Sequence, residues 1–277
     1  MKTRVITSVI GALIIIPFFV FMHSVAFPIL FAIASAIAVH EVIKACDVKN
    51  HVITTISCIT AAIIPFIFHF KLEIPFMPVA IIYCMAYFII MVIMNKVTVF
   101  NDIVISLAAT IMIPSSFSVA ILLSDLYISQ PEKFSKSSGV FFIIVAVFCA
   151  WMTDIFAYFS GRAFGKHKLC PKISPKKTVE GAIGGVIGAI ALNLILFFVF
   201  DKFIFITHSI KWYEIIIFAG VLSVISMFGD LSASVIKRNH NVKDFGKILP
   251  GHGGIMDRTD SLLFVLPALY ACLYFIY

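Results

Sequence analysis

Charged side chains are scarce in this sequence. Asp, Glu, Lys and Arg together make up 13% of its 277 residues, whereas hydrophobic residues make up 61%. Soluble domains usually contain about 25% charged and about 45 to 50% apolar residues, so no single water-soluble core accommodates this excess. The apolar residues are gathered in runs of roughly 18 to 22, the length at which a helix crosses about 30 Å of hydrocarbon. The scarcity of charge therefore excludes a soluble domain and predicts a helical membrane protein.

Cysteine pairs with the spacing of a metal site are also missing. The sequence has six cysteines but no CxxC motif, and Cys58, Cys84, Cys149 and Cys272 lie within apolar runs. We interpret these thiols as small core residues and not as zinc ligands. The net charge is +7, and the basic residues lie between the membrane-length apolar runs. This arrangement argues against nucleic acid as a partner and favours anionic lipid headgroups and nucleotide phosphates.

The apolar runs predict an all-α, polytopic integral membrane protein with about nine transmembrane helices. The first run follows Lys2 and Arg4 and resembles a signal peptide. It is too long for one and has no evident small-residue cleavage site, so we expect a retained span. We place the spans at residues 5–22, 25–41, 52–69, 75–94, 103–124, 139–160, 181–200, 213–235 and 261–277.

Lys and Arg are distributed unevenly between the loops that join these spans. With the N-terminus inside, 16 of the 21 Lys and Arg residues lie on the cytoplasmic side and 5 lie outside. The positive-inside rule therefore predicts a cytoplasmic N-terminus and an external C-terminus. Most of the cytoplasmic charge falls in two loops, 161–180 and 237–260.

Two carboxylates interrupt otherwise apolar helices. Asp154 and Asp230 each lie within a predicted span, where a charge costs about 2.5 to 3.5 kcal/mol. Both are therefore functional candidates, although a hydrogen bond between helices is the alternative. The predicted topology places both near the cytoplasmic side, where Asp257 and Asp260 precede the last span. Four acids beside two basic loops suit divalent cations held by oxygen ligands while Lys and Arg bind phosphates.

The helix that holds Asp230 also carries a polar stripe. A stripe within a span must face protein or water, and its serines are equally compatible with simple contacts between helices. Its members recur at helical spacing and are Ser223, Ser226, Asp230, Ser234 and Lys237.

Glycines mark two further segments. Those around His252, in PGHGGIMDR, form a flexible loop whose backbone N–H groups are suited to cradle an anion. The string GRAFGK is not a P-loop, because its glycine spacing is one residue short and His167 takes the Ser/Thr position. The glycines of GAIGGVIGAI, which begins at Gly181, fit close helix packing instead.

The segment from Ser234 to Asp260, SVIKRNHNVKDFGKILPGHGGIMDRTD, resembles the signature of the phosphatidate cytidylyltransferases, also called CDP-diglyceride synthases. The upstream sequences DIFAYFSGRAFGKHKL and SPKKTVEGAIGG are similar to the other cytoplasmic segment of that family. One position departs: Ala233 stands where family members often carry a carboxylate, so any role of that acid is vacant or filled by another residue. The residues in register are Ser234, Lys237, Arg238, Lys243, Asp244, Gly246, Pro250, His252, Gly253, Gly254, Asp257, Arg258 and Asp260.

The resemblance implies an enzyme of phospholipid biosynthesis that converts CTP and phosphatidate to CDP-diacylglycerol and pyrophosphate. It also implies Mg²⁺ with a second, monovalent ion nearby, a homodimer, and a multi-pass protein of the cell inner (cytoplasmic) membrane whose active site faces the cytoplasm. We expect a single membrane domain over residues 1–277, with scaffold spans in 1–138 and catalytic spans with both loops in 139–277. The expected metal ligands are Asp154, Asp230 and Asp257, the expected catalytic residues are Asp230, Asp257, Lys237, Arg238, His252 and Arg258, and the expected substrate-binding residues are Lys166, Ser174, Lys177, Thr178, Lys243, Gly253 and Gly254.

Two other functions share some of these features. A CTP-dependent polyprenol kinase would use similar helices, acids and nucleotide, but would transfer the γ-phosphoryl group. A membrane transporter would place polar groups near the bilayer midplane and usually show an internal repeat, whereas the polar groups here gather toward the predicted cytoplasmic side. An archaeal ether-lipid form of the cytidylyl transfer differs only in the lipid tails, which the sequence does not read out.

Overall fold

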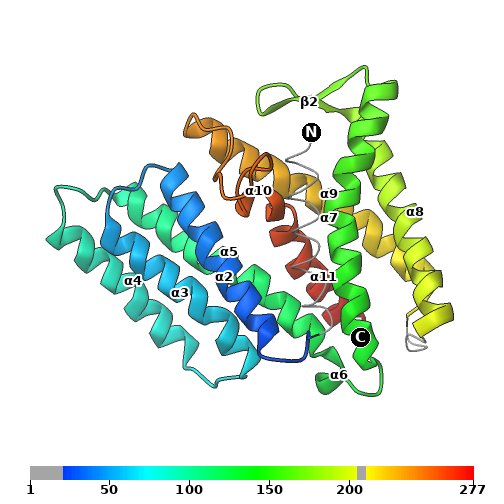
Figure 1. Ribbon diagram of the computed structural model, residues 1–277, viewed down its shortest axis with the longest axis horizontal. Helices are drawn as coiled ribbons and strands as arrows, with labels where there is room; N and C mark the ends of the chain where they lie inside the picture. Colours follow the sequence, from blue (N-terminus) through cyan, green and yellow to red (C-terminus); the bar gives the residue numbers. More distant parts are fainter. Residues whose placement is uncertain (1–20, 205–209) are drawn as a thin grey trace. The chain divides into compact units, whose positions relative to one another are not determined.

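The computed structural model describes residues 21–204 and 210–277 and is almost entirely helical (Figure 1). In this part of the chain, eight helical segments are long and apolar enough to cross a membrane. The prediction of an all-α, polytopic membrane protein is therefore confirmed, while the first predicted span, 5–22, lies outside the described residues apart from its last two. The segments are α2 (Ala26–Ala45), α3 (His51–His69), α4 (Phe76–Ile93), α5 (Phe100–Ser124), α7 (Lys136–Phe164), α8 (Val179–Ile204), α9 (Trp212–Asn239) and the pair α10 (Met256–Thr259) and α11 (Leu262–Ile276), with the short α6 (Leu126–Ser129) between α5 and α7.

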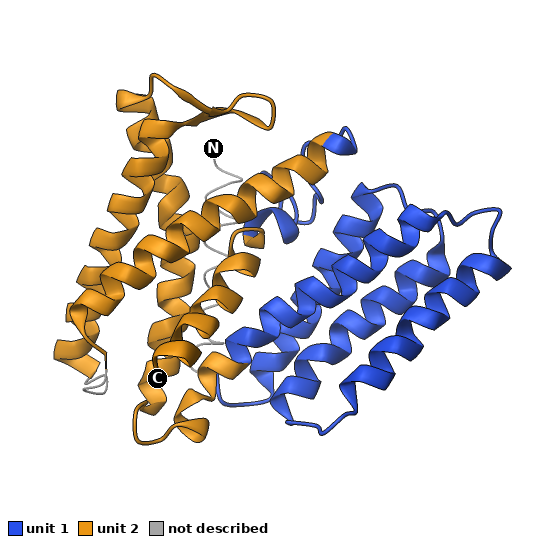
Figure 2. Ribbon diagram, turned by 180° about the vertical axis from the view of Figure 1, so that it is seen from behind, with its two compact units in different colours: residues 1–121, 239–258 blue, residues 122–238, 259–277 orange. Residues whose placement is uncertain are grey.

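Two compact units divide the described residues between them (Figure 2). Unit 1 holds α2 to α4, most of α5 and the segment Asn239–Arg258, whereas unit 2 holds α6 to α9 and the residues Thr259–Tyr277. Each unit has its own buried apolar residues, such as Ile53 in unit 1 and Phe141 in unit 2. The expected single membrane domain, with a scaffold that ends at residue 138, stays a prediction.

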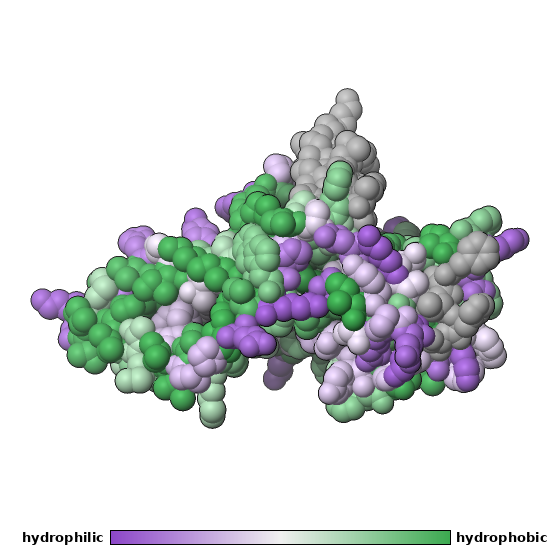
Figure 3. Space-filling model, turned by 90° about the horizontal axis from the view of Figure 1, so that it is seen from below, coloured by the Kyte–Doolittle hydropathy of each residue, from purple (hydrophilic) through white to green (hydrophobic). Residues whose placement is uncertain are grey.

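In unit 1, Ile53, Tyr87 and Ile103 form a small core between α3, α4 and α5. The hydroxyl of Tyr87 lies 2.6 Å from that of Ser57 and 2.7 Å from that of Tyr83, so its polar atom is satisfied within the apolar layer. Tyr87 is the one buried residue of α4. Ile90 and Met91 are partly buried and pack against the same core, whereas many other apolar side chains of this helix, such as that of Phe76, are exposed. Apolar side chains accordingly cover broad areas of the face shown in Figure 3.

In unit 2, α7 and α8 pack closely because small residues line their contact. A Cβ on Gly181 would come within 2.7 Å of the carbonyl oxygen of Ala157. A Cβ on Gly185 would come equally close to the carbonyl oxygen of Thr153. These approaches confirm the predicted packing role of the glycines in this segment.

Between α7 and α8, the chain forms an antiparallel hairpin of β1 (Lys168–Cys170) and β2 (Ser174–Thr178). The predicted loop 161–180 was therefore too long, because α7 continues to Phe164 and α8 already begins at Val179. The strands are too short and too polar to show the apolar alternation on which a strand prediction depends. Since both neighbouring helices are candidate spans, the hairpin lies at the membrane surface.

Candidate active site

Helix α9 turns its polar stripe into unit 2. Ser223, Ser226 and Lys237 are buried, whereas the side chain of Asp230 keeps 23% of its surface exposed. The hydroxyl of Ser226 donates a hydrogen bond to the backbone carbonyl of Ala150 in α7 at 3.3 Å. The prediction that this stripe faces protein or water is confirmed, because its serines and lysine are largely enclosed by protein while its acid remains partly accessible.

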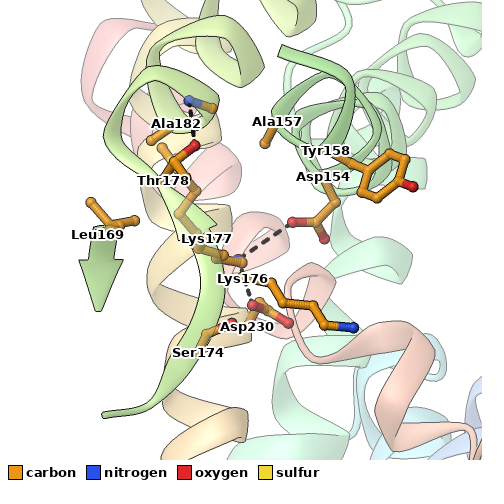
Figure 4. A pocket seen from close by; sticks show the side chains of 12 residues that line it. Asp154, Ala157, Tyr158, Leu169, Ser174, Lys176, Lys177, Thr178, Ala182 and Asp230 are labelled. Carbon is orange, nitrogen blue, oxygen red and sulfur yellow. Dashed lines mark hydrogen bonds and ion pairs between the residues drawn. The ribbon is translucent and has the colours of Figure 1, made fainter. Parts of the chain in front are cut away.

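Lys177 joins two acids that come from different helices (Figure 4). Its Nζ lies 2.5 Å from Oδ2 of Asp230 on α9 and 3.6 Å from Oδ1 of Asp154 on α7. The lysine itself belongs to β2. The two acids predicted within spans therefore meet, and the hairpin supplies the cation between them.

Burial and charge act on the Lys177 ammonium in opposite directions. Its removal from water lowers the pKa, but the carboxylates of Asp230 and Asp154 together raise it by more. The pKa of Lys177 therefore lies above that of an ordinary lysine. The side chain stays protonated at neutral pH, so the two acids share one fixed positive charge.

A pocket of about 300 Å³ opens beside this ion pair (Figure 4). Lys176 and Lys177 line it together with Ser174 and Thr178, so its polar side is rich in groups that bind phosphate. Three of the predicted substrate-binding residues, those of β2, thus share one cavity. The apolar part of the lining is formed by Ala157, Leu169, Ala182 and Met227.

Asp260 and Lys237 extend the charged cluster within unit 2. They are 7% and 9% exposed. The carboxylate of Asp260 interacts electrostatically with Lys237, Asp230 and Asp154. The predicted convergence of three of the four acids is confirmed, whereas the fourth, Asp257, belongs to unit 1.

In unit 1, Asp257 holds together the segment 245–256, which contains Gly246, Gly251, Gly253 and Gly254 and is called the glycine loop below. Its Oδ2 accepts the backbone N–H groups of Phe245 at 2.8 Å, Gly254 at 3.0 Å and Gly246 at 3.4 Å. Gly253 has a φ of 85°, a conformation that glycine adopts readily, and a Cβ there would lie 2.9 Å from the same oxygen. Of the segment predicted to cradle an anion, PGHGGIMDR, the backbone N–H of Gly254 thus donates to the carboxylate of Asp257, and the other two donors precede that segment.

Comparison with known proteins identifies the family. The model of the cytidylyltransferase family matches residues 2–276. The chain belongs to this family. The resemblance drawn from the motif is thereby confirmed.

Three relatives in the cytidylyltransferase family show how far the similarity extends. The phosphatidate cytidylyltransferase of Thermotoga maritima is 30% identical over 279 residues, which cover 98% of this chain and 95% of the relative. That of Bacillus subtilis is 31% identical over 278 residues, which cover 98% and 96%. With that of Staphylococcus saprophyticus, the chain is 46% identical over 135 residues, which span about half of each protein, 49% of this chain and 50% of the relative.

A divalent cation, which the resemblance to this family implies, fits two acids of the pocket. Proteins usually hold Mg²⁺ by one or two carboxylates and leave its other positions to water and substrate phosphates. Asp154 and Asp230 already direct one oxygen each to a shared cation, the ammonium of Lys177. Within residues 21–204 and 210–277, no group of three or more His, Cys, Asp or Glu side chains is placed to hold a metal. A site with two carboxylates, open to phosphate, is the arrangement that fits.

Other residues predicted for this family's site lie outside the lining of the pocket. The backbone N–H of Lys166 donates to Oε2 of Glu180 at 3.0 Å. Nδ1 of His167 lies 2.6 Å from Oε1 of the same acid, so Glu180 ties the start of the hairpin to α8. Arg238 is exposed in the last turn of α9, which extends into the predicted loop 237–260.

The remaining predicted residues lie in unit 1. Lys243 is exposed. Nε of Arg258 donates to the backbone carbonyl of His252 at 2.8 Å, and this hydrogen bond helps to fix the conformation of the loop. The roles assigned to Lys243, His252 and Arg258 stay predictions.

Three residues with evident positions in these regions were missed from the sequence. Lys176 lines the pocket, but its position there depends on strand β2, which was not predicted. Glu180 was assigned to the predicted loop 161–180, although an acid is common in the first turn of a helix and could have marked the start of α8. Glu41 is buried near the end of α2, and its position at the edge of an apolar run was the one available sign.

Proposed function

We propose that this protein is a phosphatidate cytidylyltransferase, which transfers the cytidylyl group of CTP to phosphatidate and yields CDP-diacylglycerol and pyrophosphate. Membership of the cytidylyltransferase family supports this, as do relatives of that name that align over nearly the whole chain. The observation that carries the proposal is the ammonium of Lys177 between the carboxylates of Asp154 and Asp230. It lies in a pocket beside a hairpin at the membrane surface, where a lipid phosphate and a nucleotide can meet.

Phosphatidate needs no general base to become a nucleophile. A phosphate monoester has a second pKa near 6, so the headgroup is mostly dianionic at neutral pH. One of its oxygens forms a bond to the α-phosphorus of CTP, and the bond from that phosphorus to the bridging oxygen breaks. Pyrophosphate leaves with the electron pair. The task of the protein is therefore to align two anions and to offset their repulsion.

The pocket contains the groups for this task. Lys176 and Lys177 contribute positive charge, and Ser174 offers a hydroxyl donor. Mg²⁺ bound by Asp154 and Asp230 would neutralise charge on the CTP phosphates. A metal-binding role of Asp257, a monovalent ion and a homodimer stay predictions that rest on the family resemblance.

The proposal also covers the location of the protein and its orientation in the membrane. Eight long apolar helices and the bacterial relatives support a multi-pass protein of the cell membrane. We further propose that the pocket faces the cytoplasm, because 16 of the 21 basic residues lie on that side when the N-terminus is inside. This orientation gives the site direct access to CTP.

Two forms of labelled CTP test the reaction. Purified protein is given phosphatidate, Mg²⁺ and CTP that carries its label at either the α- or the γ-phosphate. Cytidylyl transfer brings the α-label into the lipid fraction and the γ-label into pyrophosphate. Lipid that carries the γ-label would identify a CTP-dependent kinase instead, and the absence of any labelled lipid would leave the transporter as the better hypothesis.

A further inference from the structure

Glu41 is a buried acid in the part of the chain predicted to serve as scaffold. It lies near the C-terminal end of α2 with 3% of its surface exposed. A carboxylate removed from water requires hydrogen-bond donors around it. Its Oε2 accepts the backbone N–H of Met256 at 2.9 Å, from a residue 215 positions away in the sequence. Within unit 1, Glu41 thus fixes one end of the glycine loop to a transmembrane helix.

Gly246 and Gly254 lie directly against this carboxylate. Neither has a positive φ, so the backbone conformation does not require glycine at either position. A Cβ on Gly246 would overlap Oε1 of Glu41, and a Cβ on Gly254 would overlap both carboxylate oxygens. The nearest obstacle to a side chain at these two positions is therefore the carboxylate of Glu41.

The same two glycines are held from a second direction. Their backbone N–H groups donate to Oδ2 of Asp257, while Glu41 packs against their Cα atoms. We propose that Glu41 is a positioning residue, which sets the shape of the loop that carries His252 and leads into α10 with Asp257. We call this arrangement, in which Glu41 and Asp257 hold Gly246 and Gly254 from two sides, the clamp. The expected effect on turnover rests on the proposed cytidylyl transfer, whereas the clamp itself does not.

A double-mutant cycle of Glu41→Ala and Gly254→Ala tests the clamp. In the wild-type background, the new methyl group of Gly254→Ala displaces the carboxylate, and turnover should fall about tenfold or more. In the Glu41→Ala background that overlap is absent, so adding Gly254→Ala should change turnover less than about twofold. Gly220→Ala is the control, because a Cβ there meets one side-chain atom at 3.7 Å, and it should be neutral in both backgrounds. Additive effects of the two substitutions would overturn the proposal.

Hydrogen exchange of the loop needs no substrate, so it separates the clamp from the proposed activity. Glu41→Leu fills the space but accepts no hydrogen bond, and the peptide 245–256 should exchange about tenfold to a hundredfold faster while α3 is unchanged. Glu41→Gln keeps an acceptor oxygen and should restore most of the protection. Glu73→Gln, at an exposed acid of the same unit, should have no effect. Unchanged exchange in Glu41→Leu would refute the positioning role, whereas a wild-type protein without cytidylyl transfer would refute only the proposed function.

Discussion

The pocket of unit 2 and the glycine loop of unit 1 both gather carboxylates, but these carboxylates have different partners. Asp230 contacts the ammonium of Lys177, which ends a long and flexible side chain. Asp257 accepts three backbone N–H groups through one oxygen. A side-chain ammonium can be exchanged for another cation, whereas backbone N–H groups leave only when the loop rearranges. Asp230 is therefore suited to receive a cation, and Asp257 is suited to hold its own loop.

Replacing each acid by its amide should damage these two regions in different ways. Asn keeps the size and hydrogen-bonding capacity of Asp but lacks the charge that a divalent cation requires. Asp230→Asn should leave the loop intact and reduce turnover by orders of magnitude, because charge neutralisation is the main catalytic device in phosphoryl chemistry. Asp257→Asn should reduce turnover and also speed hydrogen exchange of the peptide 245–256.

Turnover, thermal unfolding and Mn²⁺ binding by electron paramagnetic resonance distinguish the two outcomes. Asp201→Asn, at an exposed acid in unit 2, is the matched control. Partial rescue of Asp230→Asn at raised Mg²⁺ would support direct coordination. A fully active, Mg²⁺-dependent Asp230→Asn protein would refute its assignment as a metal ligand. Weaker Mn²⁺ binding in Asp257→Asn would show that this acid serves the metal in addition to its loop.

Lys177→Met should have the next largest effect, because it leaves Asp154 and Asp230 without the cation between them. Turnover should fall about a hundredfold, while Mn²⁺ should bind more tightly because no ammonium competes with it. Lys172→Met, at an exposed residue between the strands, is the control. Unchanged turnover together with unchanged Mn²⁺ affinity would contradict the arrangement in the pocket.

The stability that Lys177 contributes should follow its raised pKa. A folded-state pKa above the ordinary lysine value of about 10.4 stabilises the fold below that value. This contribution is lost as the pH rises through the higher folded pKa. The difference in thermal stability between wild type and Lys177→Met should therefore stay constant from about pH 6 to 9 and shrink only in strong alkali.

Local sequence predicted most of the fold, because each span is determined by its own apolar run. The predicted span 181–200, for example, lies inside α8, Val179–Ile204. Asp154 and Asp230 could be found for the same reason, since a carboxylate within an apolar run is conspicuous wherever the chain folds. Their direct contact with Lys177 was not predicted.

The parts that could not be predicted depend on distant or weak signals. The hairpin that carries Lys177 consists of short polar strands without apolar alternation. The burial of Glu41 depends on a loop 215 residues further along the chain, which no local pattern in α2 reveals. The hydrogen bonds of Asp257 likewise require the folded loop, so the sequence indicated an acid beside glycines but not which backbone groups it would hold.

The smallest effect is expected for Ser226→Ala, which tests whether a serine in the polar stripe of α9 only joins two helices or also serves the reaction. Ser226 lies one turn before Asp230, is fully buried, and donates to the carbonyl of Ala150 at the long distance of 3.3 Å. Ser226→Ala removes one hydrogen bond between membrane helices, a loss of about 0.6 kcal/mol, and the smaller side chain fits the same space. The melting temperature should therefore fall by no more than a few degrees, and turnover and Mn²⁺ binding should stay near the wild-type values. Asp230→Asn is the natural contrast, because it alters the same face of the same helix but removes a charge. If Ser226→Ala instead lost turnover as severely as Asp230→Asn while remaining folded, the whole stripe would serve the reaction, and the distinction between a contact serine and a metal-binding acid would be wrong.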